Sequence, residues 1–109
     1  MRNFLRCKNG YYPMKQAVEE ARKDPTVHLI DVRTREEYLA GHLADSILLP
    51  LGDVYNLEDD VPNKEDIIYV YCRSGARSAQ ACQIFQEMGY QHVTNIGGIL
   101  DWEGPLQRG

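Results

Sequence analysis

One cysteine of this sequence lies directly after an apolar run and directly before a short turn. The segment reads Tyr71-Cys72-Arg73-Ser74-Gly75-Ala76-Arg77-Ser78. A tight turn of this kind can aim successive backbone N–H groups inward, and a helix that follows adds the partial positive charge of its N-terminus. Together with the two arginines, these groups favour the thiolate of Cys72. They predict a thiol pKa below the ~8.5 of a free cysteine.

The predicted thiolate is a nucleophile that needs no histidine beside it. The histidines, His28, His42 and His92, lie elsewhere in the sequence, and a thiol with a depressed pKa attacks without a paired base. We therefore predict that Cys72 is the catalytic residue. The residues predicted to bind substrate are those of the turn, Arg73, Ser74, Gly75, Ala76, Arg77 and Ser78.

Two chemistries use a cysteine held among N–H groups. Attack on phosphorus gives a phosphocysteine, and attack on a sulfane sulfur gives a persulfide. A bound phosphate needs a ring wide enough for three equatorial oxygens, whereas a persulfide adds a single sulfur atom. Four residues separate Cys72 from Arg77, so the length of the loop is the feature that can separate the two chemistries.

The segments around this turn alternate between strand and helix patterns. Apolar residues at helical spacing predict a helix over 14–23, and Thr34 with Glu37 has the spacing of a capping box, which predicts a short helix ending near Gly41. Another helix follows the cysteine turn and ends at Gly89. Strands are expected at 27–32, 47–49, 67–71 and 92–96, a short helix or loop at 52–65, and a turn from Gly97 leading into a terminal helical segment.

Strands that alternate with helices at this spacing predict right-handed crossovers. The fold class is therefore α/β, a small parallel sheet with helices on both faces. Ligands of such sheets bind at the carboxyl ends of the strands, and Cys72 follows the most apolar strand, 67–71. We expect one domain over residues 1–109, with its core over about 12–104.

The composition narrows the class of protein. The chain has 109 residues, 43% hydrophobic and 26% charged, which is typical of a globular domain. The chain has a net charge of −4, so it lacks the excess of basic residues that nucleic-acid binding requires. No apolar stretch approaches the roughly 20 residues that span a bilayer, and no secretory signal is recognisable. We expect a cytoplasmic protein with neither nucleic acid nor membrane as partner.

The other candidate residues have structural explanations. Cys82 shares a helical stripe with Phe85 and is expected to be a small core residue. The imidazole of His42 is expected to bond to backbone, and nothing marks Cys7 as a resolving thiol. The spacing of the cysteines does not fit a zinc site, so neither a metal nor a cofactor is expected.

The whole pattern resembles a single-domain rhodanese. Cysteine and arginine bracket four residues in the rhodanese active loop, whereas cysteine phosphatases carry five. Further pieces of the chain are similar to that family's signatures: Ile30-Asp31-Val32-Arg33, Glu37-Tyr38, Gly41-His42-Leu43, Ala44 to Pro50, and Gly97-Gly98-Ile99 with Trp102. The likeness covers about residues 27–102. One departure is Leu48-Leu49-Pro50, where an Asn-containing form often precedes the proline.

The resemblance implies a sulfurtransferase with two half-reactions and no cofactor. Cys72 would take sulfur from thiosulfate or a persulfide donor, and a thiol, cyanide or a sulfur-relay protein would accept it. Arg73 and Arg77 would hold the sulfonate, while Asp31 and Arg33 would brace the loop by ion pairing. Two alternatives stay open: a non-catalytic or partner-dependent sulfur-carrier module and, disfavoured by the loop length, a cysteine phosphatase or arsenate reductase.

Overall fold

The computed structural model describes residues 11–109 and arranges their strands in one sheet. The strands are Val27–Asp31 (β1), Ile47–Leu48 (β2), Ile67–Cys72 (β3) and His92–Gly98 (β4). They lie in the order β2-β1-β3-β4, and every pairing is parallel. The predicted strand at 67–71 is thus a central strand, which explains why it is apolar along its whole length.

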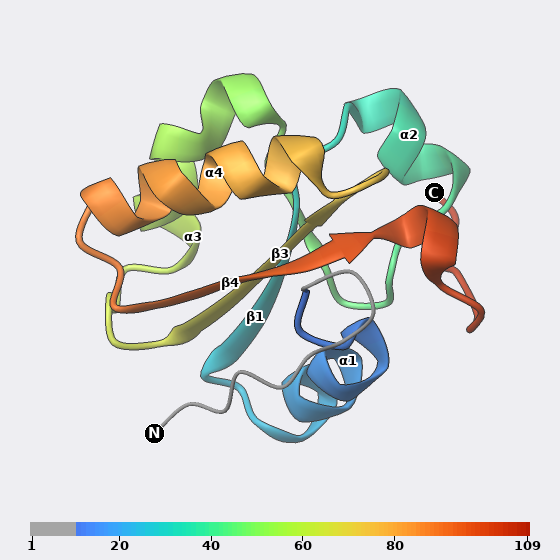
Figure 1. The fold of residues 1–109 in the computed structure, drawn as a ribbon, viewed down its shortest axis with the longest axis horizontal. Helices are drawn as coiled ribbons and strands as arrows, with labels where there is room; N and C mark the ends of the chain where they lie inside the picture. The colour runs from blue at the N-terminus through green and yellow to red at the C-terminus, as the bar shows by residue number, and fades with distance from the viewer. Residues whose placement is uncertain (1–10) are drawn as a thin grey trace.

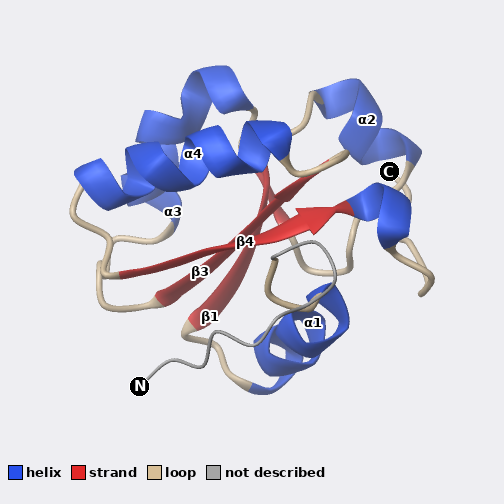
Figure 2. Cartoon of the chain, in the orientation of Figure 1, coloured by secondary structure: helices blue, strands red, loops and turns tan. Residues whose placement is uncertain are grey.

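The helices cover both faces of this sheet. Helix α1 lies on one face, and α3 and α4 lie on the other (Figures 1 and 2). This arrangement confirms the predicted α/β fold, a parallel sheet with helices on both faces. The elements are α1 (Met14–Lys23), α2 (Arg35–Ala40), α3 (Leu57–Asp60), α4 (Ala76–Glu87) and two 3-10 helices at Leu51–Asn56 and Ile99–Asp101.

Local sequence signals account for most of these boundaries. Thr34 caps α2: its hydroxyl accepts the Glu37 N–H at 3.2 Å, while the Glu37 carboxylate accepts the Thr34 N–H at 2.9 Å. The predicted capping box is therefore confirmed, and it fixes where α2 begins. Helix α4 ends just before Gly89, whose φ of +104° suits glycine.

The predicted turn at Gly97 is wrong, because β4 continues through Gly98. Tyr71 pairs with Gly97 and Cys72 with Gly98, after a register shift between Val70 and Tyr71. Gly98 therefore serves a close approach of β4 to the backbone of Arg73 and Ser74, and Gly97, with a φ of +92°, lies against the Tyr11 side chain, so neither marks a reversal of the chain. The helical segment expected after them is only the short 3-10 helix Ile99–Asp101.

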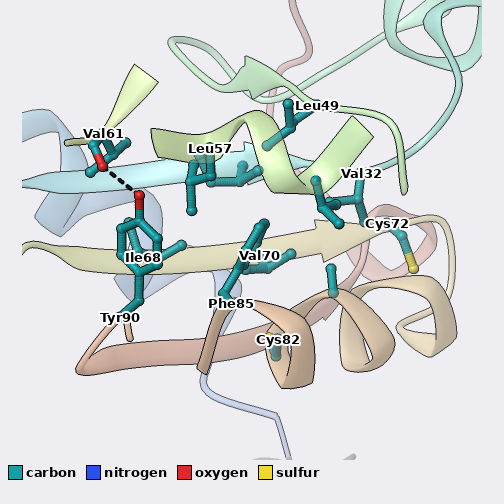
Figure 3. Close-up of a cluster of buried hydrophobic side chains, with 13 residues drawn as sticks. Val32, Leu49, Leu57, Val61, Ile68, Val70, Cys72, Cys82, Phe85 and Tyr90 are labelled. Atoms are coloured by element: carbon teal, nitrogen blue, oxygen red, sulfur yellow. Dashed lines mark hydrogen bonds between the residues drawn. The ribbon is translucent and has the colours of Figure 1, made fainter. Parts of the chain in front are cut away.

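Alternation along β3 divides the core between the two faces of the sheet. Ile68, Val70 and Cys72 belong to the cluster under α4, and Tyr69 and Tyr71 belong to the cluster under α1. Figure 3 shows the cluster under α4, with Cys72 at one end of it. Since successive side chains of a strand point to opposite faces, this alternation places the Cys72 side chain on the α4 face, where α4 begins.

In the described part of the chain, no helix has the length and apolar character needed to cross a membrane.

Candidate active site

The cysteine turn connects the end of β3 to the start of α4. Gly75 has a φ of +109°, which favours glycine, and it directly precedes the first residue of α4. This conformation turns the Gly75 N–H back toward the thiol, and the N–H donates to Cys72 Sγ at 3.0 Å. The predicted arrangement of a thiol facing backbone N–H groups at a helix N-terminus is present.

Hydrogen bonds overcome the effect of burial on the Cys72 thiol. The residue is only 1% exposed, and this burial is the largest single influence on the thiol pKa, which it raises because the charged form loses contact with water. The Ser78 hydroxyl, 3.5 Å from Sγ, and the N–H groups of Ser78, Gly75 and Ser74 favour the charged form. Together they hold the pKa of the Cys72 thiol below its ordinary value, so the site favours a thiolate.

An asparagine that the sequence reading did not single out fixes the turn from β4. Asn95 Nδ2 donates to the Gly75 carbonyl at 3.1 Å. The single Ser78 hydroxyl hydrogen has three acceptors within reach, which are Asn95 Oδ1 at 2.8 Å, the Gly75 carbonyl at 3.0 Å and Cys72 Sγ at 3.5 Å. The Gly97 N–H, which can only donate, reaches the same Oδ1 at 2.9 Å and defines the orientation of the amide. A polar amide within a strand, just before its buried end, was the signal that could have identified this residue.

Arg77 forms an ion pair with Glu37 of α2. Nη1 and Nη2 of Arg77 donate to Oε1 and Oε2 of Glu37 at 2.8 and 3.0 Å, and both side chains are about one-third exposed. This hydrogen-bonded pairing lowers the pKa of Glu37 to about 2 and raises that of Arg77. The sequence analysis placed Glu37 in the capping box and in the Glu37-Tyr38 signature but did not pair it with Arg77, because that contact spans 40 residues.

The remaining turn residues lie at the mouth of the site. Arg73, Ser74 and Ala76 are exposed, while Ser78 is buried beside the thiol. The Arg73 carbonyl accepts the Leu100 N–H at 3.2 Å, which ties the turn to the segment after β4. Of the six predicted turn residues, Ser74, Gly75 and Ser78 provide the hydrogen bonds to the Cys72 sulfur described above.

Gly98 allows β4 to pass directly against the turn. A Cβ atom on Gly98 would lie 2.3 Å from the Arg73 carbonyl oxygen and 2.4 Å from Ser74 Cα. Both distances are far below the ~3.5–4.0 Å of ordinary contacts. The position therefore requires glycine, and the backbone of β4 sets the place of the cysteine turn.

The predicted ion pair between Asp31 and Arg33 is present and buried. Arg33 Nη2 donates to Asp31 Oδ2 and to the Gly41 carbonyl, both at 2.7 Å. These bonds attach the segment after α2 to the end of β1. They contact Gly41 rather than the cysteine turn, and the bracing of that turn by this pair stays a prediction.

The second described cysteine is a core residue, as predicted. Cys82 lies on α4 within the cluster under that helix (Figure 3). Burial and the nearby charge of Cys72 raise the pKa of Cys82 to about 12, so this thiol is not a nucleophile at neutral pH. His42 Nδ1 contacts the Tyr38 carbonyl at 2.8 Å, which confirms the predicted bond to backbone. Cys7 lies outside the described residues.

Comparison with known proteins gives several relatives named as sulfurtransferases or sulfur carriers. The chain is 43% identical over 83 residues to the Escherichia coli "Thiosulfate sulfurtransferase PspE", covering 75% of this chain and 80% of the relative. It is 34% identical over 94 residues to the Bacillus subtilis "Putative sulfur carrier protein YrkF", covering 85% of this chain and 49% of the relative.

Solved structures and family profiles agree with these relatives. A structure described as "rhodanese with anions from E. coli" superposes with a TM-score of 0.71 at 43% identity, covering 75% of this chain and 98% of the other. Residues 14–104 match the profile of the Rhodanese-like domain. This match spans the described helices α1 to α4, all four strands and the cysteine turn. The chain therefore belongs to the rhodanese family.

Proposed function

We propose that this protein is a sulfurtransferase that moves sulfane sulfur from thiosulfate or a persulfide donor to a thiophilic acceptor through a persulfide on Cys72. The observation that carries the proposal is the environment of Sγ. It lies 3.0 Å from the Gly75 N–H, at the start of α4, with a thiol pKa below the ordinary value. The relative named a thiosulfate sulfurtransferase supports the same reaction class.

The first half-reaction loads sulfur onto the enzyme. The Cys72 thiolate attacks the outer sulfur of thiosulfate, a new S–S bond forms, and the S–S bond of thiosulfate breaks with its electron pair leaving on sulfite. Three negative charges enter the step and three leave it, one on the persulfide and two on sulfite. Arg73 and Arg77 would hold the sulfonate oxygens, because guanidinium groups donate to oxyanions in pairs.

The second half-reaction returns the thiolate. An acceptor such as cyanide or a thiolate attacks the outer sulfur of the persulfide and forms a new bond to it. The S–S bond of the persulfide breaks, and its electron pair stays on the Cys72 sulfur. The N–H groups of the turn and the Ser78 hydroxyl would stabilise the charge on sulfur in both the loaded and the free state. No proton transfer is required when both nucleophiles are ionised.

The dimensions of the turn favour sulfur over phosphorus as the substrate atom. Gly75 N–H lies within hydrogen-bond distance of Sγ itself, and the sulfur is buried in a turn with four residues between Cys72 and Arg77. A transferred sulfur adds one atom to this environment, whereas a phosphoryl group needs room for three oxygens. Hydrolysis of a generic aryl phosphate at a rate comparable to sulfur transfer would favour the phosphatase alternative.

Mass spectrometry of the intact protein tests the proposal. Incubation with thiosulfate should add the mass of one sulfur atom and release one sulfite for each persulfide formed. Cys72→Ser should abolish both, whereas the matched control Cys82→Ala, which removes only the buried unreactive thiol, should load normally. Equal turnover by Cys72→Ser and the unsubstituted protein would refute the proposal.

A second candidate is a sulfur carrier that is loaded by a partner enzyme. It is favoured by the relative named a putative sulfur carrier and by the pairing of Arg77 with Glu37, which offsets part of the positive charge available to thiosulfate. Slow loading from thiosulfate combined with fast loading from a persulfidated donor would support the carrier. Fast loading from thiosulfate alone would support the enzyme.

A further inference from the structure

The Arg77 guanidinium has hydrogen-bond donors left for a substrate, but the Glu37 carboxylate offsets part of its positive charge. Arginine has five N–H donors, and Arg77 uses one on each Nη for the two oxygens of Glu37, at 2.8 and 3.0 Å. Donors remain for a substrate oxyanion. The carboxylate in bidentate contact nevertheless offsets part of the positive charge that a bound donor molecule meets, because the two opposite charges lie close together.

The other charged groups around the turn are also nearly balanced. Arg33 is compensated by Asp31 at 2.7 Å. Arg73 has no carboxylate within 4.0 Å in the part of the chain that the structure describes, so it contributes one positive charge. The Cys72 thiolate contributes one negative charge. The formal charges of these described groups therefore sum to zero, and the N–H groups of the turn are left as the main attraction for a donor anion.

We propose that Glu37 is a specificity-determining residue that reduces the preference of the site for dianionic sulfur donors over donors of lower charge. This inference rests on the proposed sulfur transfer through Cys72. It deepens that function by naming the donor class, monoanionic thiosulfonates and the persulfides of thiols, rather than the dianion thiosulfate. The hydrogen-bond donors of Arg77 still recognise a sulfonyl or sulfonate oxygen in either class.

Glu37→Gln is a clean substitution for this question. A glutamine at the third helical position preserves a capping box, so the Thr34 contact that begins α2 can be kept. The side chain has nearly the same shape, but it loses its charge and, because an amide nitrogen can only donate, one of the two hydrogen bonds from Arg77. Glu36→Gln is the matched control, because it removes an identical charge from an exposed neighbour on the same helix.

The experiment compares two donors that differ by one charge, thiosulfate and benzenethiosulfonate. The second-order rate of persulfide formation on Cys72 is measured for each by rapid quench and mass spectrometry at low salt. The negative charge of Glu37 acts on the charge of the donor across the site through a largely aqueous medium. Its removal should change the rate about threefold for each unit of charge that the donor carries. Glu37→Gln should therefore raise the ratio of the thiosulfate rate to the benzenethiosulfonate rate about threefold, and Glu36→Gln should leave that ratio unchanged.

An unchanged or lowered ratio in Glu37→Gln, with normal persulfide formation in the unsubstituted protein, would overturn this inference and leave the proposed function standing. If the unsubstituted protein forms no persulfide with either donor, the proposed function fails and the inference fails with it. A salt series on the unsubstituted protein gives an independent check should the variant unfold. The thiosulfate rate should change less than about twofold between roughly 20 and 200 mM salt, and a steep fall would contradict the balanced site.

Discussion

A methyl group at Gly98 should displace the cysteine turn while the fold survives. In Gly98→Ala the new carbon would lie 2.3 Å from the Arg73 carbonyl oxygen, 2.4 Å from Ser74 Cα and 2.7 Å from the Ser74 carbonyl carbon. Every one of these atoms is backbone, so no side chain can rotate away. The pairing of β4 with β3, which extends to Cys72 and Gly98, holds β4 in place. The turn therefore has to move away from β4.

The required movement sets the size of the effect. Ordinary contacts of these atoms lie near ~3.5 Å, so a displacement of about 1 Å is needed. A shift of that size would break or weaken the 3.0 Å bond from the Gly75 N–H to Cys72 Sγ. A misplacement of ~1 Å at a catalytic group costs about a hundredfold in rate. Forcing a methyl group into a packed site costs about 1–3 kcal/mol of stability.

Two measurements and a matched control test this reasoning. Sulfur transfer from thiosulfate to cyanide should fall about a hundredfold in Gly98→Ala, and thermal unfolding should show a cooperative transition at a lower midpoint. Gly52→Ala is the control, because a Cβ atom there meets nothing within 4 Å and the residue lies outside the left-handed region. Full activity with unchanged stability in Gly98→Ala would refute the claim that β4 sets the position of the turn.

Three further predictions concern the charges around the site. Ser78→Ala removes the hydroxyl that lies 3.5 Å from Sγ. Because this long, shared hydrogen bond to a thiolate is worth about 1 kcal/mol, alkylation of Cys72 by iodoacetamide at pH 7 should slow roughly fivefold. An identical pH–rate profile would show that the hydroxyl does not stabilise the thiolate. Asp31→Asn leaves the buried Arg33 guanidinium unpaired and should cost about 3–5 kcal/mol in urea unfolding; a loss below about 1 kcal/mol would mean that the pair adds little. The pKa of Glu37 is lowered from 4.5 to about 2, so its ionised form contributes stability that is complete above pH 4.5 and is lost as the pH falls toward 2. The urea midpoints of the unsubstituted protein and Glu37→Gln should therefore differ most above pH 5 and converge below it, and a constant difference would contradict the linkage.

The fold was predictable from the sequence because its signals are local or periodic. The capping box of Thr34 and Glu37 and the apolar run of β3 act over a few residues, so they are visible without the tertiary structure. The turn predicted at Gly97 failed for the opposite reason. Glycine can mark a reversal of the chain or a close approach of two backbones, and only the neighbouring turn, which lies more than 20 residues away in the sequence, decides between them.

The candidate site divides in the same way. The sequence by itself indicated the candidate nucleophile, since a thiol at the end of an apolar strand, followed by a glycine turn and a helix, has much of its electrostatic environment within seven residues. Only the tertiary structure decided which distant groups complete that environment. Glu37 comes from α2 and compensates Arg77, and Asn95 comes from β4 and orients Ser78. Parallel strands bring their carboxyl ends to one edge of a sheet, and the contacts made there follow from strand order, which no local pattern of residues specifies.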